Sequence, residues 1–408
     1  MSERQQLRSY MVVTAAYWLF TLTDGALRML VLGYFHALGY SPFQLASLFF
    51  LYELCGVLTN LLGGWIGSRA GLKLTLGIGL GLQLLALTLL SGLSSQWSEI
   101  VQISWVIIAQ GMSGIAKDFT KISAKSAIKA LVPANQNSVL FRWVAILTGS
   151  KNTLKGVGFF LGGFLLSTIG FRQSLWGMAG GIALALVGIS IFLPRAMGKS
   201  SIKHALADAL KIPRSITILA AARLFLFCAR DVWFVVGLPV FLSEVLGWTF
   251  LGVGTYLALW VIGYGMIQAF TPKLLPRLGQ DTNNDARSAQ LWGAILALIP
   301  LAIYILLRLQ YPPQIVVLAG LAVFAVLFAI NSAIHSYLIL AYSDPDRTTL
   351  NVGFYYMANA MGRLMGTLLS ELLYQWGGLQ VCLLTASAMV ALSVSIAIAL
   401  PDTRKHAG

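Results

Sequence analysis

Charged residues are scarce in this chain. Only 10% of its 408 residues are Asp, Glu, Lys or Arg, whereas 58% are hydrophobic and the mean hydropathy is +0.79. Soluble domains typically carry about a quarter charged residues. The composition therefore excludes an ordinary soluble protein and is typical of a chain that lies mostly within a membrane.

Cysteine and nucleotide-binding motifs are also lacking. The 3 cysteines, Cys55, Cys228 and Cys382, form no C-x-x-C pair, so the sequence predicts neither a disulfide framework nor a metal centre, and no cofactor is expected. There is no glycine-rich phosphate loop with Lys and Ser/Thr, which argues against nucleotide hydrolysis as an energy source. No nucleophile motif is present either, and we expect no enzymatic activity.

The chain contains instead a series of long apolar runs. About 20 apolar residues are needed to cross a hydrocarbon layer about 30 Å thick. The first run lacks a small-residue cleavage site, so it is expected to remain as a span rather than to be removed as a signal peptide. The runs predict an all-α membrane protein of twelve transmembrane helices, near residues 10–35, 41–66, 72–93, 98–119, 139–168, 173–194, 216–242, 248–271, 290–309, 314–342, 348–376 and 379–400.

Positive charge is distributed unevenly between the two ends of these runs. The net charge is +14, and almost all Lys and Arg outside the runs lie on one side, with only Arg172 and Arg308 on the other. Because Lys and Arg mark cytoplasmic loops, both termini are expected to be cytoplasmic. Topology thus accounts for the basic balance, and no nucleic-acid partner is expected.

The two halves of the sequence resemble each other at an offset of about 207 residues. Two parallel halves related by an axis along the membrane normal are typical of transporters. The expected domains are six-helix bundles at 1–194 and 216–408, joined by a cytoplasmic linker at 195–215 that contains a short amphipathic helix. The offset aligns Asp24 with Asp231, Asn152 with Asn359, and Gly170 with Gly377.

Cationic side chains occur inside the apolar runs. A charge at the centre of a transmembrane helix costs roughly 2.5–3.5 kcal/mol on insertion scales, so such a residue calls for an ion pair, a wet cavity or an anionic ligand. Arg and Lys are the usual partners of phosphate-like oxyanions. The sequence therefore predicts transport of a negatively charged solute. The candidate substrate-binding residues are Arg28, Lys117, Lys151, Asn152, Lys155, Arg230 and Arg363.

Ion pairing within the protein is an alternative role for some of these cations. Asp24 and Arg28 are four residues apart, so they share a helix face and could neutralise each other. Arg363 could pair with Glu371. Lys151 and Lys155 have no acid nearby in sequence, which favours an external anion over distant acids.

Lysines also repeat every four residues at 117, 121, 125 and 129. The last three of them, Lys121, Lys125 and Lys129, are expected to form a solvated cytoplasmic face that attracts anions. Lys117 is expected to approach the substrate site beside Asp118.

Carboxylates within the runs are candidate proton carriers, because a proton gradient is the energy source left for active transport. The candidate proton-coupling residues are Asp24, Glu53 and Asp231. Structural ion pairing is an equal alternative for the two aspartates. His335 could relay protons or simply form a hydrogen bond in the core.

The loop after the second run carries a recognisable motif. Residues 64–73, GWIGSRAGLK, resemble the cytoplasmic loop motif G-x-x-x-D-R-x-G-R-K of the major facilitator superfamily. Gly64, Arg69, Gly71 and Lys73 match, and Ser68 stands where the motif has an acid. The resemblance implies the major facilitator fold and a conformational role for the four matching residues.

Four longer strings carry a narrower resemblance: YWLFTLTDGALRML (17–30), SGIAKDFTKISAKSAIKALVP (113–133), RWVAILTGSKNTLKGVGFFLGG (142–163) and ARLFLFCARDVWFVVGLPVFL (222–242). They are similar to the organoarsenical efflux permeases called ArsJ. That resemblance implies export of 1-arseno-3-phosphoglycerate, which glyceraldehyde-3-phosphate dehydrogenase makes when it uses arsenate in place of phosphate. The dehydrogenase would be the functional partner, and arsenate resistance the outcome.

The expected mechanism is alternating access with proton antiport. The expected protein is a monomer that crosses the bacterial inner membrane several times. A broader organic anion, phosphate or drug:proton antiporter of the same fold is an alternative function. A passive anion channel is an alternative of a different class.

Overall fold

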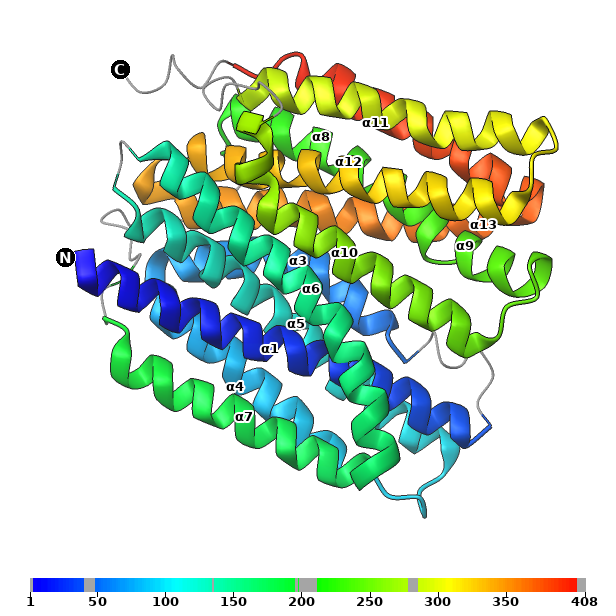
Figure 1. Ribbon diagram of the computed structural model, residues 1–408. Coiled ribbons are helices and arrows are strands. Elements are labelled where there is room, and N and C mark those ends of the chain that lie inside the picture. Colours follow the sequence, from blue (N-terminus) through cyan, green and yellow to red (C-terminus); the bar gives the residue numbers. More distant parts are fainter. Residues whose placement is uncertain are drawn as a thin grey trace. The chain divides into compact units, whose positions relative to one another are not determined.

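The computed structural model describes residues 3–39, 48–133, 136–194, 197, 211–277 and 285–401. Within these ranges the chain forms helices and connecting loops and no strands (Figure 1). The helices of the first half are α1 (Glu3–Ala37), α3 (Phe50–Ala70), α4 (Leu72–Ser91), α5 (Glu99–Leu131), α6 (Asn137–Ile169) and α7 (Phe171–Phe192).

The second half begins with α8 (Arg214–Phe234), which continues through a short helix and a π-helical turn. A helix of 50 residues, α13, closes this half. The elements are α8, α9 (Gly237–Val240), η2 (Phe241–Val245), α10 (Phe250–Arg277), α11 (Asp285–Arg308), α12 (Pro313–Ala341), the 3-10 turn η3 (Pro345–Arg347) and α13 (Thr348–Ala397).

The long helix α13 is broken where the sequence predicts the end of one span. Gly377 and Gly378 have non-helical backbone angles, and Gly378 has a φ of 64°, a conformation that glycine adopts at little cost. The break separates the predicted spans 348–376 and 379–400. The apolar runs on either side of this glycine pair thus locate the bend from sequence.

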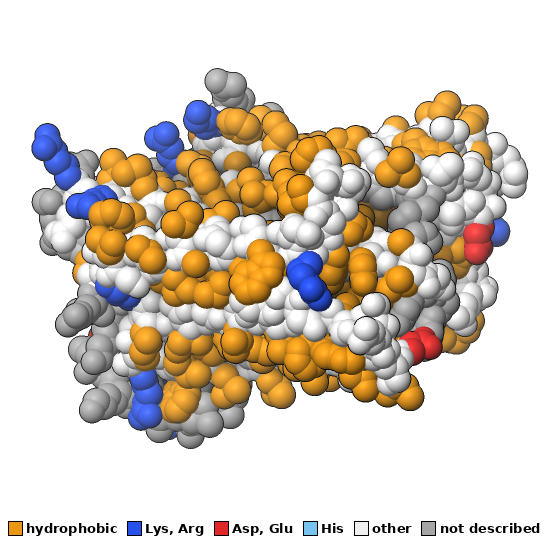
Figure 2. All heavy atoms as spheres, turned by 90° about the horizontal axis from the view of Figure 1, so that it is seen from below, with side chains coloured by type: hydrophobic (Ala, Val, Ile, Leu, Met, Phe, Trp, Pro, Cys, Tyr) orange, Lys and Arg blue, Asp and Glu red, His pale blue; other side chains and the backbone are white. Residues whose placement is uncertain are grey.

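Eight helices among the described residues are long and apolar enough to cross a membrane. The last of them contains the broken helix α13. Helices α1, α3 and α6 are not in this group, although they have 35, 21 and 33 residues and occupy three of the predicted spans. The count of twelve crossings therefore stays a prediction. Figure 2 shows hydrophobic side chains over much of the visible face, as a lipid-facing surface requires.

The described helices fall into two compact units. Unit 1 comprises residues 1–136, 150–211 and 344–357, and unit 2 comprises 137–149, 212–343 and 358–408. Helices α6 and α13 each contribute to both units. The predicted boundaries at 194 and 216 stay a prediction, and the predicted amphipathic helix at 195–215 lies mostly outside the described residues.

Within unit 1, α4 packs against α5 and α7, and α1 contacts α5 and α7. Glycines bring α1 and α6 still closer together. A Cβ added at Gly158 would lie 2.6 Å from the carbonyl oxygen of Leu22, and one added at Gly25 would lie 2.6 Å from that of Lys155. Such backbone approach needs small residues. It places Asp24, next to Gly25, beside α6.

Unit 2 is built around aromatic side chains. Trp233 of α8 contacts Trp260 of α10 and Phe324 of α12 edge to face, and Phe324 stacks on Phe328. Helix α8 also approaches α13 closely, since a Cβ at Gly366 would lie 2.7 Å from the carbonyl oxygen of Cys228. The aromatic core thus fixes α8 against α10 and α12, and the approach at Gly366 fixes it against α13.

Candidate functional site

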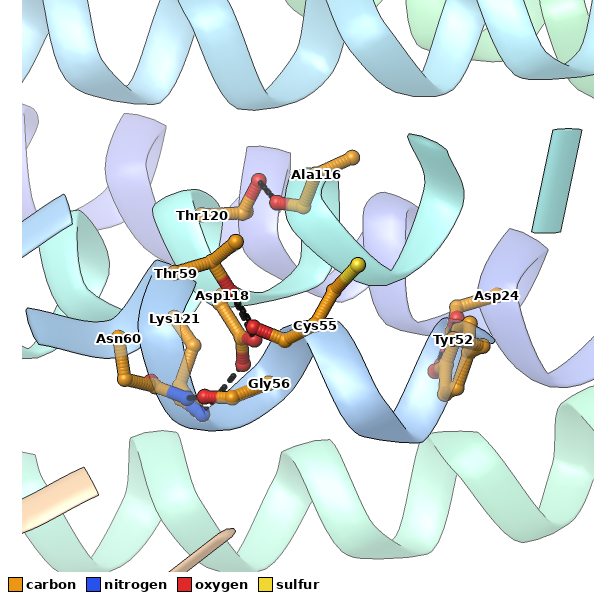
Figure 3. A network of polar contacts seen from close by, with 10 residues as sticks. All are labelled: Asp24, Tyr52, Cys55, Gly56, Thr59, Asn60, Ala116, Asp118, Thr120 and Lys121. Carbon is orange, nitrogen blue, oxygen red and sulfur yellow. Dashed lines mark hydrogen bonds and ion pairs between the residues drawn. The ribbon is translucent and has the colours of Figure 1, made fainter. Parts of the chain in front are cut away.

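Three helices of unit 1 bring polar side chains together around Asp24. The Oη of Tyr52 on α3 donates a hydrogen bond to Oδ1 of Asp24 at 2.7 Å (Figure 3). On the other side, Nζ of Lys155 on α6 lies 4.0 Å from Oδ2. Asp24 and Tyr52 are both buried. The structure therefore brings together two of the predicted residues, Asp24 and Lys155, and adds Tyr52 from α3.

The ring of Tyr52 also attracts cations. Lys117 Nζ of α5 lies 3.7 Å from the ring centroid, and the guanidinium carbon of Arg28 lies 6.0 Å from it and 5.0 Å from the ring of Phe49. Cations over an aromatic face are attracted by its electron density. Three predicted cations, Arg28, Lys117 and Lys155, thus gather around one tyrosine and one aspartate. We call Asp24, Tyr52, Arg28, Lys117 and Lys155 the Asp24 cluster.

A second buried carboxylate lies one residue beyond Lys117. Oδ2 of Asp118 accepts a hydrogen bond from Thr59 of α3 at 2.8 Å, and Oδ1 forms an ion pair with Lys121 at 2.7 Å (Figure 3). Lys121 is therefore not part of a solvated face, and Lys125 is only 1% exposed. The expectation that Lys121 and Lys125 are solvated is wrong, because both face other parts of unit 1. Lys129 is half-buried.

The remaining predicted residues of unit 1 lie nearby on α6 and α3. Lys151 and Asn152 are half-buried on α6, about one turn before Lys155. Helix α6 is also joined to α1 by a hydrogen bond of 2.6 Å from Trp18 to Ser150. Glu53 is helical, but its side chain is outside the described residues, so its role in proton coupling stays a prediction.

In unit 2 the predicted residues Arg230, Asp231 and Arg363 meet. Nη2 of Arg230 lies 2.5 Å from Oδ1 of Asp231, and Nε of Arg363 on α13 lies 3.2 Å from Oδ2. Asp231 is 1% exposed, whereas the side chains of Arg230 and Arg363 are 16% and 29% exposed. The structure thus pairs Arg363 with Asp231. We call these three residues the Asp231 cluster.

Arg223 lies two turns before Arg230 on α8 and is buried in a polar network. It donates hydrogen bonds to Oδ1 of Asn359 at 3.0 Å and to Oγ of Ser332 at 3.0 Å. Tyr264 and Gln268 also contact that hydroxyl, each at 3.2 Å. This arrangement fastens α8 to α10, α12 and α13. His335 is buried one turn further along α12.

The loop motif residues Gly71 and Lys73 shape the junction between α3 and α4. Gly71 has a φ of 89°, which glycine tolerates and other residues rarely adopt. Lys73 Nζ donates to the carbonyl oxygens of Ser190 and Leu193 at 2.7 Å each, at the end of α7. A cation at this helix end satisfies carbonyls that lack helical partners and complements the helix dipole.

The other two motif residues lie on the last turns of α3. A Cβ at Gly64 would lie 2.8 Å from the carbonyl oxygen of Thr349, so only glycine allows this approach of α13 to α3. The guanidinium of Arg69 lies 5.0 Å from the ring of Trp65. Ser68, in the position of the motif acid, donates to the carbonyl oxygen of Trp65 at 2.7 Å.

Sequence reasoning missed Tyr52 and Thr59, and it named Asp118 only as the neighbour of Lys117. Asp118 could have been recognised from the sequence, because a carboxylate inside an apolar run is as unusual as a cation there. Tyr52 could not be recognised in this way, since a tyrosine in a membrane helix is common. Its importance depends on residues from α1 and α5 that only the fold brings near.

Among the residues that the structure describes, both clusters hold more cations than carboxylates. The Asp24 cluster has one carboxylate and three cations, and the Asp231 cluster has one carboxylate and two. A partly buried excess of positive charge favours an anion, and Lys and Arg provide N–H donors for its oxygens. Each cluster can therefore bind an oxyanion group.

Comparison with solved structures shows which known folds resemble this one. The human organic anion transporter MFSD10 (TETRAN) is similar with a TM-score of 0.76 at 16% identity, covering 96% of this chain and 99% of that one. The proton:xylose symporter XylE gives 0.76 at 13%, covering 99% and 97%. The fucose:proton symporter FucP of E. coli gives 0.72 at 13%, covering 96% and 98%.

The family of the chain is shown by sequence comparison. A search of curated proteins found no match. The family model described as Major Facilitator Superfamily matches residues 13–335, most of the chain. It covers both clusters except Arg363, together with the loop motif at 64–73. The chain is a multi-pass membrane transporter that belongs to the major facilitator superfamily.

Proposed function

We propose that this transporter exports 1-arseno-3-phosphoglycerate from the cytoplasm in exchange for protons and so confers resistance to arsenate. The observation that carries the proposal is the excess of cations around single carboxylates, Asp24 in unit 1 and Asp231 in unit 2. The proposed substrate carries a phosphate and an arsenate group, and both are oxyanions that Lys and Arg bind through charge-assisted hydrogen bonds.

The resemblance of residues 17–30, 113–133, 142–163 and 222–242 to organoarsenical efflux permeases supports this substrate. These strings contain every member of both clusters except Tyr52 and Arg363. Pentavalent arsenic in the substrate is bound through its oxygens, so the three dispersed cysteines are not required for binding. Glyceraldehyde-3-phosphate dehydrogenase is the proposed source of the substrate, and the inner membrane of a bacterium is the proposed location of a monomeric carrier.

Asp24 is the carboxyl group that we assign to proton coupling. Its contacts are one hydroxyl at 2.7 Å and one ammonium at 4.0 Å, whereas Asp231 contacts two guanidinium groups within 3.2 Å. Protonating Asp24 therefore disturbs fewer strong contacts than protonating Asp231.

Uptake into everted membrane vesicles tests the proposed function. In such vesicles the cytoplasmic face is outside, so arsenate, glyceraldehyde 3-phosphate, NAD and purified dehydrogenase can be added to it. We expect arsenic uptake only with the complete mixture, and an acidic lumen should increase it. The matched controls omit the dehydrogenase or use vesicles without the transporter.

A general organic anion exchanger is the second candidate function. The structural likeness to a human protein described as an organic anion transporter favours it, although at 16% identity that likeness concerns the fold. Equal uptake of arsenate with and without the dehydrogenase would support this broader function. Uptake that follows only the substrate gradient and ignores the proton gradient would indicate a passive channel.

A further inference from the structure

Successive lysines of α5 each lie over a tyrosine ring. Lys117 Nζ is 3.7 Å from the ring centroid of Tyr52, and Lys121 Nζ is 4.3 Å from that of Tyr356. Lys125 Nζ is 5.3 Å from the ring of Tyr356. Residues four apart share one helix face and are separated by about 6 Å along the axis. We call Lys117, Lys121 and Lys125 the lysine ladder.

The lower part of the ladder is covered by the beginning of α13. Lys125 also lies 5.5 Å from the ring of Tyr355, and Lys125 and Tyr355 are at most 1% exposed. The covering segment, 344–357, belongs to unit 1. Its Gly353 approaches α3 so closely that a Cβ would lie 2.7 Å from the carbonyl oxygen of Asn60. The segment is thus closely packed on α3 as well as on the lysines.

Lys125 is buried beneath the covering segment. An ammonium ion is strongly hydrated in water, so water or an anion that reached Lys125 would interact favourably with it. Oδ1 of Asn60 on α3 is also buried, without a hydrogen-bond partner among the described residues, and the carbonyl oxygen of Asn60 meets Gly353 of the covering segment. Water admitted at this place would provide the missing partner.

We propose that Lys121 and Lys125 form a second oxyanion site, which Tyr355 and Tyr356 close in this structure. The site lies between the Leu131 end of α5 and the Asp24 cluster, so an anion can pass from one lysine of the ladder to the next. This inference rests on the proposed transport of an oxyanion. It adds a site, and a way of opening it, that the Asp24 and Asp231 clusters do not include.

Competition between the anion and the tyrosine rings explains how the site opens. A lysine forms stronger contacts with an oxyanion through charge-assisted hydrogen bonds than with an aromatic face. Lys121 forms an ion pair with Asp118, so an anion that contacts Lys121 also competes with that carboxylate. When an oxyanion binds the ammonium groups of Lys121 and Lys125, these groups leave the rings of Tyr355 and Tyr356. Substrate binding and release of segment 344–357 are then a single event.

Thiol labelling at Asn60, which is buried on α3 and whose carbonyl oxygen meets Gly353 of the covering segment, can detect this opening. Asn60→Cys would be placed in a chain whose native cysteines, Cys55, Cys228 and Cys382, are replaced by Ala, after checking that this chain still takes up arsenic. The labelling rate with N-ethylmaleimide is measured in everted vesicles with the complete substrate-generating mixture and with the dehydrogenase omitted. We expect the complete mixture to increase the rate severalfold. An unchanged rate in vesicles that take up arsenic would overturn the inference.

Variants of the two contact partners provide the matched controls. Lys125→Gln should lose the substrate-dependent increase in labelling, and Lys125→Arg, which keeps the charge, should retain it. Tyr356→Leu should label rapidly even without substrate, whereas Tyr356→Phe, which keeps the ring, should label slowly as the parent does. Equal labelling of the Leu and Phe variants would show that the ring does not close the site.

These measurements separate this inference from the proposed function. If the parent vesicles take up no arsenic, the proposed function fails, and the Tyr356 variants, which need no substrate, still decide whether the rings close the site. If arsenic uptake is normal and neither residue changes labelling, the second site is wrong and the proposed function stands. Should Lys125→Gln fail to reach the membrane, Lys125→Arg and the two Tyr356 variants still give the answer.

Discussion

Nε of Arg363 lies 3.2 Å from Oδ2 of Asp231, and this ion pair repeats the relationship between Lys155 and Asp24 about 207 residues earlier in the chain. In each case the acid lies on the first long helix of its half and the cation lies on a helix that approaches it through glycine. The two pairs differ in strength, because Asp231 contacts a second arginine and Asp24 contacts a tyrosine. The two halves thus share the same placement of an acid and a cation, but the other side chains around each acid differ.

Replacing Arg363 should weaken substrate recognition. We expect Arg363→Gln to raise KM for arsenic uptake by roughly 10-fold or more, since a hydrogen bond to a charged group is worth about 1.5–3 kcal/mol. The protein should still reach the membrane, because Arg230 continues to pair with Asp231. Arg308→Gln, at an exposed position at the end of α11, is the matched control and should behave as wild type. An unchanged KM for Arg363→Gln would remove Arg363 from the site.

The two aspartates should respond differently to neutralisation. Asp24→Asn should keep substrate-dependent uptake but lose its dependence on the proton gradient, measured by dissipating the gradient with an ionophore. Asp231→Asn should instead lower the amount of folded protein, because it leaves two guanidinium groups without their carboxylate, which costs about 3–5 kcal/mol in buried pairs. If Asp24→Asn stays sensitive to the gradient, Glu53 is the carboxyl to replace next.

Tyr52 offers a test in which hydroxyl and ring can be removed separately. Tyr52→Phe loses the hydrogen bond to Asp24 but keeps the ring under Lys117, so we expect an altered pH profile of uptake and little change in KM. Tyr52→Leu also removes the ring, and the loss of the cation–π contact, worth about 0.5–2 kcal/mol, should raise KM severalfold. Wild-type behaviour of both variants in both measurements would remove Tyr52 from the site.

The close approach of α1 to α6 should be sensitive to a single methyl group. We expect Gly158→Ala to lower the Tm of the purified protein by several degrees, because the new Cβ would lie 2.6 Å from the carbonyl oxygen of Leu22 and overpacking costs about 1–3 kcal/mol. Gly163→Ala on the same helix is the control, since a Cβ added there would meet open space within 4 Å. Equal Tm values for the two variants would mean that α1 and α6 can move apart freely.

Much of the fold follows from the sequence. Every predicted apolar run contains helix, and the break at Gly377 and Gly378 falls between two predicted spans. Long apolar segments must satisfy their own backbone hydrogen bonds in lipid, and a helix is the way a single segment does so. This is a local requirement, so local sequence is sufficient to predict it.

The candidate site was only partly predictable, because its contacts join residues that are far apart in the sequence. The cations could be recognised because a charge in an apolar run is conspicuous, but their partners come from distant segments. Arg363 and Asp231 are 132 residues apart, and the Arg223–Asn359 contact spans 136 residues. The prediction that Lys125 is solvated failed because Tyr355 and Tyr356, more than half the chain away, cover it.

The sequence by itself determined that this protein is helical, lies in a membrane and carries buried positive charge, because composition, run length and residue type are enough for these conclusions. Only the tertiary structure decided which cation meets which carboxylate, that Tyr52 joins Asp24 to Lys117, and that the lysines of α5 lie under tyrosine rings. The periodicity of a helix predicts which of its side chains lie on the same face. It does not predict which side chains of other helices lie opposite that face, because this depends on how the helices pack.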